Sequence, residues 1–275
     1  MKKLEELQTY LAQLGPIAVA VSGGVDSMTL AVVAHRANPA THIYHAISPA
    51  VPNQATARVR QYAEQEGWNL NIIDAGEIND PEYLANPANR CYFCKTNLYD
   101  GVTSHTTHLV LSGTNMDDLG DYRPGLTAAS EHQVKHPYVE TDIDKNTLRQ
   151  IAKHLQLDDL HDLPASPCLS SRIETGISIN AELLPVINEV EETLWETLQL
   201  YLPIKGVRCR IRKNGVAVEV ETNETISSTA DYALEATRVV AEKFGEKGFS
   251  SYAASITIEP YQRGSAFLVE TLSID

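Results

Sequence analysis

Long apolar runs are absent from this sequence of 275 residues. No run approaches the roughly 20 consecutive apolar residues that a membrane-spanning helix needs, which argues against an integral membrane protein. The N-terminal segment has a basic start but lacks the continuous apolar stretch of a secretory signal peptide. Leu4, Leu7, Leu11 and Leu14 recur there at helical spacing, so an amphipathic helix is predicted instead. We therefore expect a cytoplasmic protein with no membrane partner.

Basic residues are also few: 22 Lys and Arg stand against 36 Asp and Glu, which gives a formal net charge of −14 and a pI of about 5.0. A protein that binds a nucleic-acid backbone clusters its basic side chains to displace counterions. Here they are dispersed, apart from the short string Arg208, Arg210, Arg212 and Lys213. The composition argues against a nucleic acid as partner, with that string as the local exception, and it favours a small anionic ligand.

Cysteine occurs four times, which in a cytosolic chain is more typical of reactive or metal-binding thiols than of structural disulfides. Cys91 and Cys94 form a CxxC pair without a second such pair, whereas zinc needs four ligands. A third thiol, Cys168, would complete a three-cysteine iron–sulfur site that leaves one iron open. Two alternatives stay open: a redox pair beside an unrelated cysteine, or plain buried thiols. Cys209 lies in an alternating segment, which predicts a packing role.

Repeats and low-complexity segments are absent too, and 43% apolar with 21% charged residues is typical of a folded protein. The length predicts about two domains. Short apolar runs alternate with helical segments in the first part of the chain, which indicates an α/β fold with a parallel sheet and helices on both faces. The predicted strands are residues 17–21, 42–47, 70–73 and 109–111, and the predicted helices include 53–66 and 144–155, the latter with Asp144 as N-cap.

The pattern changes near residue 180. A long acidic helix is predicted over 180–200, followed by alternating segments 207–212 and 216–220 on either side of Asn214-Gly215, a strong hairpin signal. A helix at 229–244 and a strand at 252–258 complete a small α+β unit. We therefore predict an α/β domain over residues 1–178 and a smaller α+β domain over residues 179–275.

The strongest motif is SGGVDS at residues 22–27, between a buried strand and a helix. Its glycines let the backbone approach a ligand, and the helix start offers unpaired N–H groups and a positive dipole end. Ser22 and Ser27 add hydroxyl donors, whereas Asp26 would repel a phosphate and therefore indicates a bound Mg²⁺. The motif is neither a Walker A loop nor a dinucleotide-binding glycine pattern. It resembles the PP-loop of ATP pyrophosphatases, and a Gly-Gly turn that caps a helix is the alternative.

Polar residues follow two of the predicted strands. Ser48 follows the second strand, and Ser112, Gly113, Asp117 and Asp118 follow the fourth. In an open α/β sheet, ligands bind beyond the carboxyl ends of the strands. We therefore expect these residues on the same rim as the loop at 22–27, with Ser48 beside the adenine. A polar turn with an N-cap is the alternative for the segment after the fourth strand.

Five segments occur in the order expected of the LarE family of ATP-dependent sulfur transferases, which the chain resembles from about residue 15 to 260. They are SGGVDS, NRCYFCK, SGTNMDDLGDYRPG, SPCLSSR and VRCRIRKNGVAVEV. The resemblance implies an enzyme of nickel-pincer nucleotide cofactor biosynthesis. With ATP and Mg²⁺ it would adenylylate a carboxylate of a pyridinium mononucleotide and then convert that carboxylate into a thiocarboxylate.

The resemblance also implies roles for individual residues. The ATP-binding residues are Ser22, Gly23, Gly24, Asp26, Ser27, Ser48 and Gly113, and the substrate-binding residues are Arg123, Arg208, Arg210 and Glu219. Cys168 and Asp26 are the catalytic residues. Cys91, Cys94 and Cys168 hold a [4Fe–4S] cluster that carries the transferred sulfide. In the other style of the family, the single cysteine corresponding to Cys168 gives up its own sulfur and becomes dehydroalanine.

Three further expectations accompany these roles. The resemblance implies a homo-oligomer, commonly a trimer or a hexamer, with the smaller domain used for substrate binding and oligomerisation. The rival functions are a tRNA thiolase of the PP-loop class, which the acidic composition disfavours, NAD or GMP synthetase chemistry, which the cysteines do not support, and a non-enzymatic iron–sulfur protein, which the intact loop disfavours. Alternation of the arginines also fits a strand with solvated outward side chains. The sequence assigns no role to Glu191.

Overall fold

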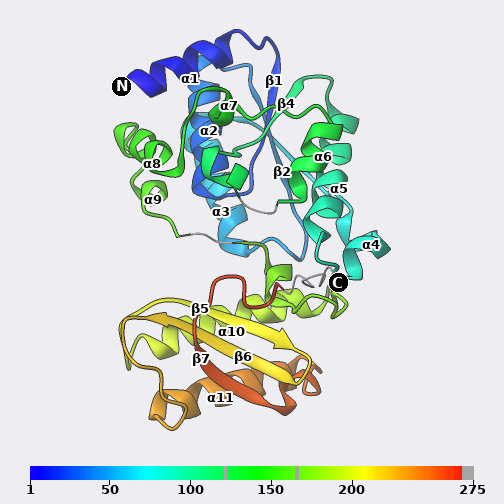
Figure 1. Cartoon of the computed structure of the whole chain (residues 1–275), viewed down its shortest axis with the longest axis vertical. Helices are drawn as coiled ribbons and strands as arrows, with labels where there is room; N and C mark the ends of the chain where they lie inside the picture. Colours follow the sequence, from blue (N-terminus) through cyan, green and yellow to red (C-terminus); the bar gives the residue numbers. More distant parts are fainter. Residues whose placement is uncertain (121–122, 165–166, 268–275) are drawn as a thin grey trace, which may run out of the picture. The chain divides into compact units, whose positions relative to one another are not determined.

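The computed structural model describes residues 1–120, 123–164 and 167–267, which form two compact units (Figure 1). The first unit comprises Met1–Tyr83 and Asn89–Ser166, and the second comprises Leu84–Ala88 and Pro167–Asp275. This division lies before the predicted boundary between residues 178 and 179. The physical reason is that the segment after Pro167 is bonded to the second unit, where Ile173 forms a β-bridge with Ile211.

Strands alternate with helices in the first unit, as the sequence predicts. The four strands are all parallel and lie in the order β3-β2-β1-β4. They are β1 (Ile17–Ala20), β2 (His42–Ala46), β3 (Asn69–Ile73) and β4 (Leu109–Leu111). The longer helices are α1 (Lys2–Ala12), α2 (Val25–Ala37), α3 (Asn53–Glu66), α5 (Arg90–His105) and α8 (Lys145–His154). The predicted α/β fold is confirmed.

Alternate residues of β1 pack into two different apolar cores. Ile17 and Val19 belong to the core that contains the buried sides of α1, α2, α3 and α8. Ala18 belongs to a second core, together with Tyr99 of α5 and Ala128 of the short helix α6 (Gly125–Glu131). Figure 1 accordingly shows helices on both sides of this sheet. Because both faces are covered, β1 is apolar along its whole length.

Several short elements of the first part of the chain were not predicted. They are the helices α4 (Pro81–Leu84), α6, α7 (Pro137–Glu140) and α9 (Asp158–His161), and the 3-10 helices η1 (Glu77–Asn79) and η2 (Met116–Gly120). Each has seven residues or fewer, which is too short for a helical period to repeat in the sequence. Within the part of the chain that the structure describes, no helix combines the length and the apolar character needed to span a membrane.

The second unit combines a mixed three-stranded sheet with two long helices, which confirms the predicted small α+β unit. Strands β5 (Ile204–Arg212) and β6 (Gly215–Thr222) form the antiparallel hairpin, and β7 (Ile256–Pro260) is parallel to β6. The helices are α10 (Leu183–Leu198) and α11 (Asp231–Glu246), with the 3-10 helices η3 (Leu169–Arg172) and η4 (Tyr252–Ala254). The strand predicted at 252–258 therefore begins later, because its first residues form η4. At Gly215, where φ is +139°, a Cβ atom would collide with the carbonyl oxygen of Ser255, so this turn requires glycine.

A short segment that precedes α5 belongs to the second unit. Its residue Asn86 is fully buried and has a positive φ of 53°. The Asn86 side-chain amide donates hydrogen bonds to the carbonyl oxygens of Ile173, Glu174 and Ile177 at 3.4, 2.9 and 2.9 Å. Gly176 N–H in turn donates to the Asn86 carbonyl oxygen at 2.9 Å. Backbone groups of the second unit are thus satisfied by a residue far earlier in the chain.

Candidate functional site

The loop of residues 22–27 joins β1 to α2, as predicted, and its geometry suits a phosphate. Gly23 has a φ of +79°, and a Cβ atom there would lie 2.7 Å from the carbonyl oxygen of Ala55. Gly24 is the N-cap of α2 and supplies no side-chain cap. Ser22 N–H donates to Ser27 Oγ at 3.0 Å, which closes the turn. The start of α2 therefore presents uncapped N–H groups inside a tight glycine loop.

The segment after β4 lies directly against this loop. Because β4 pairs parallel to β1, the carboxyl ends of both strands meet at one edge of the sheet. A Cβ atom at Gly113 would lie 2.8 Å from Ser27 N and 2.9 Å from the backbone carbon of Asp26. Ser112 Oγ lies 2.9 Å from His136 Nδ1, and burial lowers the pKa of that histidine. The structure thus brings the two predicted segments together on one rim.

Asp26 carries the carboxylate of the loop, and both of its oxygens are engaged. Oδ2 accepts a hydrogen bond from Lys145 Nζ at 2.5 Å, and Oδ1 accepts one from Asn115 Nδ2 at 3.1 Å. The fully buried Tyr138 donates its hydroxyl to the Asp26 carbonyl oxygen at 3.0 Å. The side chains of Asp26 and Lys145 remain 29% and 35% exposed. The carboxylate is therefore held in one orientation and still reaches solvent.

Lys145 is a candidate functional residue that the sequence did not reveal. It is the first residue of α8, where Asp144 caps the helix by accepting a hydrogen bond from Thr147 N–H. Lys145 N–H donates to Asp117 Oδ2 at 3.1 Å, so the residue is fixed to the segment after β4. It lies 119 positions from Asp26 in the sequence. The predicted N-cap marked the helix start but gave no indication of this ion pair.

Asp118 and Arg123 form an ion pair within the same rim. Asp118 Oδ2 accepts a hydrogen bond from Asn115 N–H at 3.0 Å, and its other oxygen lies 2.7 Å from Arg123 Nη2. The Arg123 side chain is 42% exposed, and its predicted contact with substrate stays a prediction. Asp121 and Tyr122, which belong to the same family segment, lie outside the described residues.

Ser48 follows β2, and its hydroxyl accepts a hydrogen bond from Ala50 N–H at 3.2 Å.

His45 is buried on β2, three residues before Ser48, and it connects three segments of the first unit. Its Nδ1 lies 2.9 Å from the Val21 carbonyl oxygen, and its Nε2 lies 2.9 Å from Thr56 Oγ1 of α3. Burial lowers the pKa of His45, so the ring is favoured in its neutral form. This histidine fixes the end of β1 from which the loop departs.

Cys91 and Cys94 lie near the start of α5, as its second and fifth residues. Cys91 is exposed and Cys94 is partly exposed. Cys168 belongs to the other compact unit, and Ala165 and Ser166 before it lie outside the described residues. Over residues 1–120, 123–164 and 167–267, no group of three or more His, Cys, Asp or Glu side chains is arranged to hold a metal ion. The three-cysteine site therefore stays a prediction.

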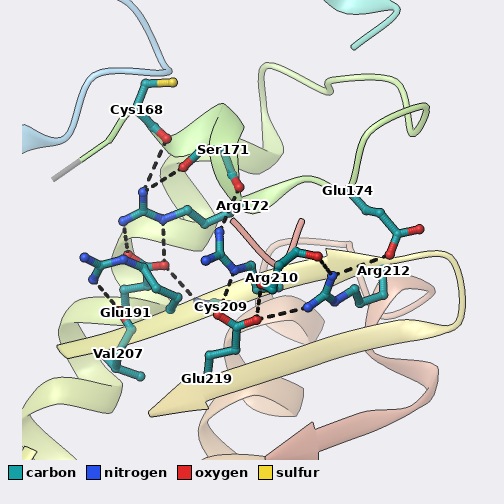
Figure 2. Close-up of polar contacts among 12 residues, drawn as sticks. Cys168, Ser171, Arg172, Glu174, Glu191, Val207, Cys209, Arg210, Arg212 and Glu219 are labelled. Carbon is teal, nitrogen blue, oxygen red and sulfur yellow. Dashed lines mark hydrogen bonds and ion pairs between the residues drawn. The ribbon is translucent and has the colours of Figure 1, made fainter. Parts of the chain in front are cut away.

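Cys168 directly precedes η3 and is partly exposed. Its carbonyl oxygen accepts a hydrogen bond from Arg172 Nη1 at 3.3 Å, while Figure 2 shows its sulfur pointing away from that guanidinium. Arg172 forms a bidentate ion pair with Glu191, with distances of 2.9 and 2.8 Å. Burial works against the charge of Arg172, but the adjacent Glu191 raises its pKa overall. Glu191, to which the sequence gave no role, also accepts a hydrogen bond from Cys209 N–H at 2.9 Å.

Arg210 and Glu219, both predicted to bind substrate, form an ion pair with each other. Arg210 Nε lies 3.0 Å from Glu219 Oε2, and the two residues are 5% and 1% exposed. Arg210 also donates to the Ser171 carbonyl oxygen at 2.9 Å, and Arg212 donates to Glu219 Oε1 at 3.0 Å (Figure 2). The reading of Arg210 as a solvated outward side chain is therefore wrong. These contacts tie η3, which follows Cys168, to β5 and β6.

Arg208 has a different environment from its two neighbours on β5. It is half-buried, lies opposite Glu219 in the strand register, and donates from Nη1 to the Val207 carbonyl oxygen at 2.7 Å. Burial and the positive charge of Arg172 lower its pKa. A lowered pKa means that the charged form of Arg208 is destabilised, and a neighbouring anion would stabilise that charged form. This guanidinium is therefore suited to bind a phosphate or a carboxylate. The Cys209 thiol is fully buried, as expected for a packing role.

Comparison with known proteins gives two relatives that align over almost their whole length and one that aligns over about 70% of it. The chain is 33% identical over 270 residues to the uncharacterized protein slr1717 of Synechocystis sp., covering 95% of this chain and 96% of that protein. It is 29% identical over 269 residues to the uncharacterized protein MJ0830 of Methanocaldococcus jannaschii, covering 94% and 97%. It is 26% identical over 198 residues to a pyridinium-3,5-bisthiocarboxylic acid mononucleotide synthase of Lactiplantibacillus plantarum, covering 70% and 71%. No family model matches the chain.

Proposed function

Because this chain belongs to the LarE-like family, we propose that it is an ATP-dependent sulfur transferase of nickel-pincer cofactor biosynthesis. The observation that carries the proposal is the loop at residues 22–27, where a tight glycine turn and an uncapped helix start surround the oriented carboxylate of Asp26. The proposed substrate is a small pyridinium mononucleotide with a carboxylate. The synthase from L. plantarum supports this choice through the product in its name.

Each part of the loop has a distinct task in this proposal. The N–H groups at the start of α2 bind phosphate oxygens, with Ser22 and Ser27 as additional donors. Asp26 is a hard oxygen ligand of the kind that Mg²⁺ prefers, and its partial exposure leaves room for a cation carried by the polyphosphate. Bound Mg²⁺ would stabilise the charge that develops on the departing pyrophosphate. Gly113, which has no side chain, lets the segment after β4 approach the backbone of Asp26 and Ser27 closely.

The proposed chemistry has two displacement steps. An oxygen of the substrate carboxylate attacks the α-phosphorus of ATP; the new O–P bond forms while the bond to the bridging oxygen breaks, and pyrophosphate leaves with that electron pair. A sulfur nucleophile then attacks the activated acyl carbon, and AMP leaves as the C–O bond breaks. The first step prepares a good leaving group, which explains why ATP is consumed although none of its phosphate groups stays in the product.

The sulfur source forms the finer part of the proposal. Cys91, Cys94 and Cys168 are all at least partly exposed thiols, and thiolates are the ligands of iron–sulfur clusters. We propose that these three hold a [4Fe–4S] cluster, which when bound would supply a replaceable sulfide. A cluster-bound sulfide is renewable, whereas a cysteine that gives up its own sulfur ends the activity of the chain after one turnover.

The loop assignment is tested with the variant Asp26→Asn and ATP:pyrophosphate exchange. We expect exchange to be lost while the melting temperature changes little, because the partly exposed carboxylate is a charge-bearing ligand and its amide is nearly isosteric. The matched control is Asp158→Asn, whose side chain is 86% exposed in the same unit. Near-normal exchange by folded Asp26→Asn would contradict the assignment.

The sulfur source is tested by anaerobic purification with iron analysis and by mass spectrometry after reaction. The cluster predicts about four irons per chain, and loss of iron in each of the variants Cys91→Ala, Cys94→Ala and Cys168→Ala. The sacrificial route predicts instead a loss of about 34 Da at Cys168 in active, iron-free protein, the mass of one H₂S leaving the thiol side chain. That result would refute the cluster and leave the ATP site untouched.

The partners of the chain form the last part of the proposal. We propose a homo-oligomer that binds a small nucleotide and no tRNA, since 36 acidic residues outnumber 22 basic ones and the basic ones are dispersed in the sequence apart from residues 208–213. Filter binding with bulk tRNA should therefore give weak retention that disappears at physiological salt. Salt-resistant, submicromolar tRNA binding would support the thiolase function instead.

A further inference from the structure

The ammonium group of Lys145 lies against the carboxylate of the phosphate-binding loop. Its Nζ is 2.5 Å from Asp26 Oδ2, and its side chain is 35% exposed. Within the described ranges, Asp26 is the one hydrogen-bond acceptor of this ammonium. An ammonium has three N–H donors, so two of them are available to a ligand that enters from solvent.

The position of Lys145 does not depend on its contact with Asp26. Its backbone N–H donates to Asp117 Oδ2, and the Asp144 cap fixes the start of the ten-residue helix to which it belongs. Its backbone therefore stays in place when the Asp26 carboxylate is altered. Such an arrangement lets a flexible four-carbon side chain serve two anions without moving the backbone.

A cation is needed at this point of the loop. A polyphosphate bound in the loop brings several negative charges close to the Asp26 carboxylate, and these like charges repel each other. The neighbouring guanidinium groups have other contacts: Arg58 donates to the Gly23 carbonyl oxygen at 2.7 Å, and Arg123 pairs with Asp118. Lys145 is the cation that contacts the loop carboxylate itself.

We propose that Lys145 is a polyphosphate-binding residue. Its ammonium bridges the Asp26 carboxylate and a phosphate oxygen of the nucleotide through charge-assisted hydrogen bonds. The inference rests on the proposed function and adds a residue that the family resemblance did not assign. It differs from a purely structural ion pair, in which Lys145 would stabilise the fold and make no contact with the ligand.

The experiment measures binding by calorimetry in EDTA, so that no metal ion contributes. ATP, inorganic pyrophosphate and adenosine are titrated into the wild-type chain and into Lys145→Met, Lys145→Gln and Lys145→Arg. The matched control is Lys153→Met, since Lys153 is an exposed lysine in the last turn of the same helix. We expect Lys145→Met and Lys145→Gln to weaken ATP and pyrophosphate about 10-fold or more, with adenosine unchanged and Lys145→Arg close to wild type.

A second comparison separates phosphate contact from simple neutralisation of Asp26. In the Asp26→Asn background the carboxylate charge is gone, so a lysine that only neutralises it would have no further effect. We expect Asp26→Asn/Lys145→Met to bind ATP about 10-fold more weakly than Asp26→Asn alone. Equal affinity of these two folded variants would overturn the proposal while leaving the ATP site intact. A wild-type chain that binds neither ATP nor pyrophosphate, with or without Mg²⁺, would overturn the proposed function together with this inference.

Discussion

Removal of Glu191 should destabilise the second unit strongly, because it leaves a buried charge without its partner. The side chains of Arg172 and Glu191 are only 3% and 11% exposed, and they share two hydrogen bonds of 2.9 and 2.8 Å. Glu191→Ala deletes both, together with the acceptor of Cys209 N–H. Breaking one partner of such a pair costs about 3–5 kcal/mol in free energy of unfolding. Arg172 also donates to the carbonyl oxygens of Pro167 and Cys168 and to the Ser171 hydroxyl, and these neutral acceptors do not neutralise its charge.

The double variant Arg172→Met/Glu191→Leu separates this charge effect from loss of packing. Replacing both charged groups with apolar side chains of similar size is often neutral, so most of the lost stability should return. The assay is urea unfolding followed by tryptophan fluorescence. The chain has two tryptophans, Trp68 in the first unit and Trp195 in the second, so a Trp68→Phe background reports the second unit alone.

Two results would refute the reasoning about this pair. A loss below about 1 kcal/mol for Glu191→Ala would mean that water reaches Arg172 and that the pair contributes no more than a surface ion pair. A double variant as unstable as Glu191→Ala would mean that packing and not charge dominates. The slope of free energy against urea should stay constant across the series, since a changed slope would indicate a different unfolded or folded state.

Three further predictions concern single side chains. Cys209 is fully buried and burial raises its pKa, so iodoacetamide should modify Cys91 in the folded chain and reach Cys209 only after unfolding, as read by mass spectrometry. Gly113→Ala should lower ATP affinity and lower the free energy of unfolding, followed by thermal unfolding, by about 1–3 kcal/mol, because the new Cβ atom would lie 2.8 and 2.9 Å from backbone atoms of Ser27 and Asp26. An unchanged variant would mean that the two segments can move apart at little cost. Burial lowers the folded-state pKa of His45 from 6.5, so below about pH 6.5 the unfolded chain takes up a proton that the folded chain resists, and the free energy of unfolding declines. His45→Gln should flatten that decline between about pH 7 and 5. An identical pH profile of stability would exclude His45 as its source.

The sequence predicted those parts of the fold that are set by neighbouring residues. Alternation of apolar strands and helices indicated the parallel sheet, and Asn214-Gly215 indicated the hairpin, because both depend on local backbone preferences. The approach of Gly113 to the loop was also predictable, since carboxyl ends of adjacent parallel strands share an edge. The pairing of Lys145 with Asp26 was not, because it joins residues 119 positions apart through side chains alone.

The arginines of β5 show the limit of periodicity in the second unit. Alternation correctly separated them from Cys209, but it did not reveal whether their face was open or covered. Arg210 is covered, because η3 packs over the strand and the Ser171 carbonyl oxygen accepts its hydrogen bond. That cover comes from a segment 39 residues earlier in the chain, and no local pattern records it.

The contacts of Asn86 have a consequence for the order in which the chain folds during synthesis. Its side-chain amide bonds to carbonyl oxygens that are made 87 to 91 residues later. At typical translation rates, that separation corresponds to about 4–18 seconds in which these three carbonyl acceptors have not yet been made. Met1–Tyr83 of the first unit is already made by then, and Asn89–Ser166 is synthesised during this interval, so the first unit can fold before the second is complete. The second unit consists of Leu84–Ala88 and Pro167–Asp275, and it can complete its hydrogen bonds only after both segments have been synthesised. Its folding is therefore the later event.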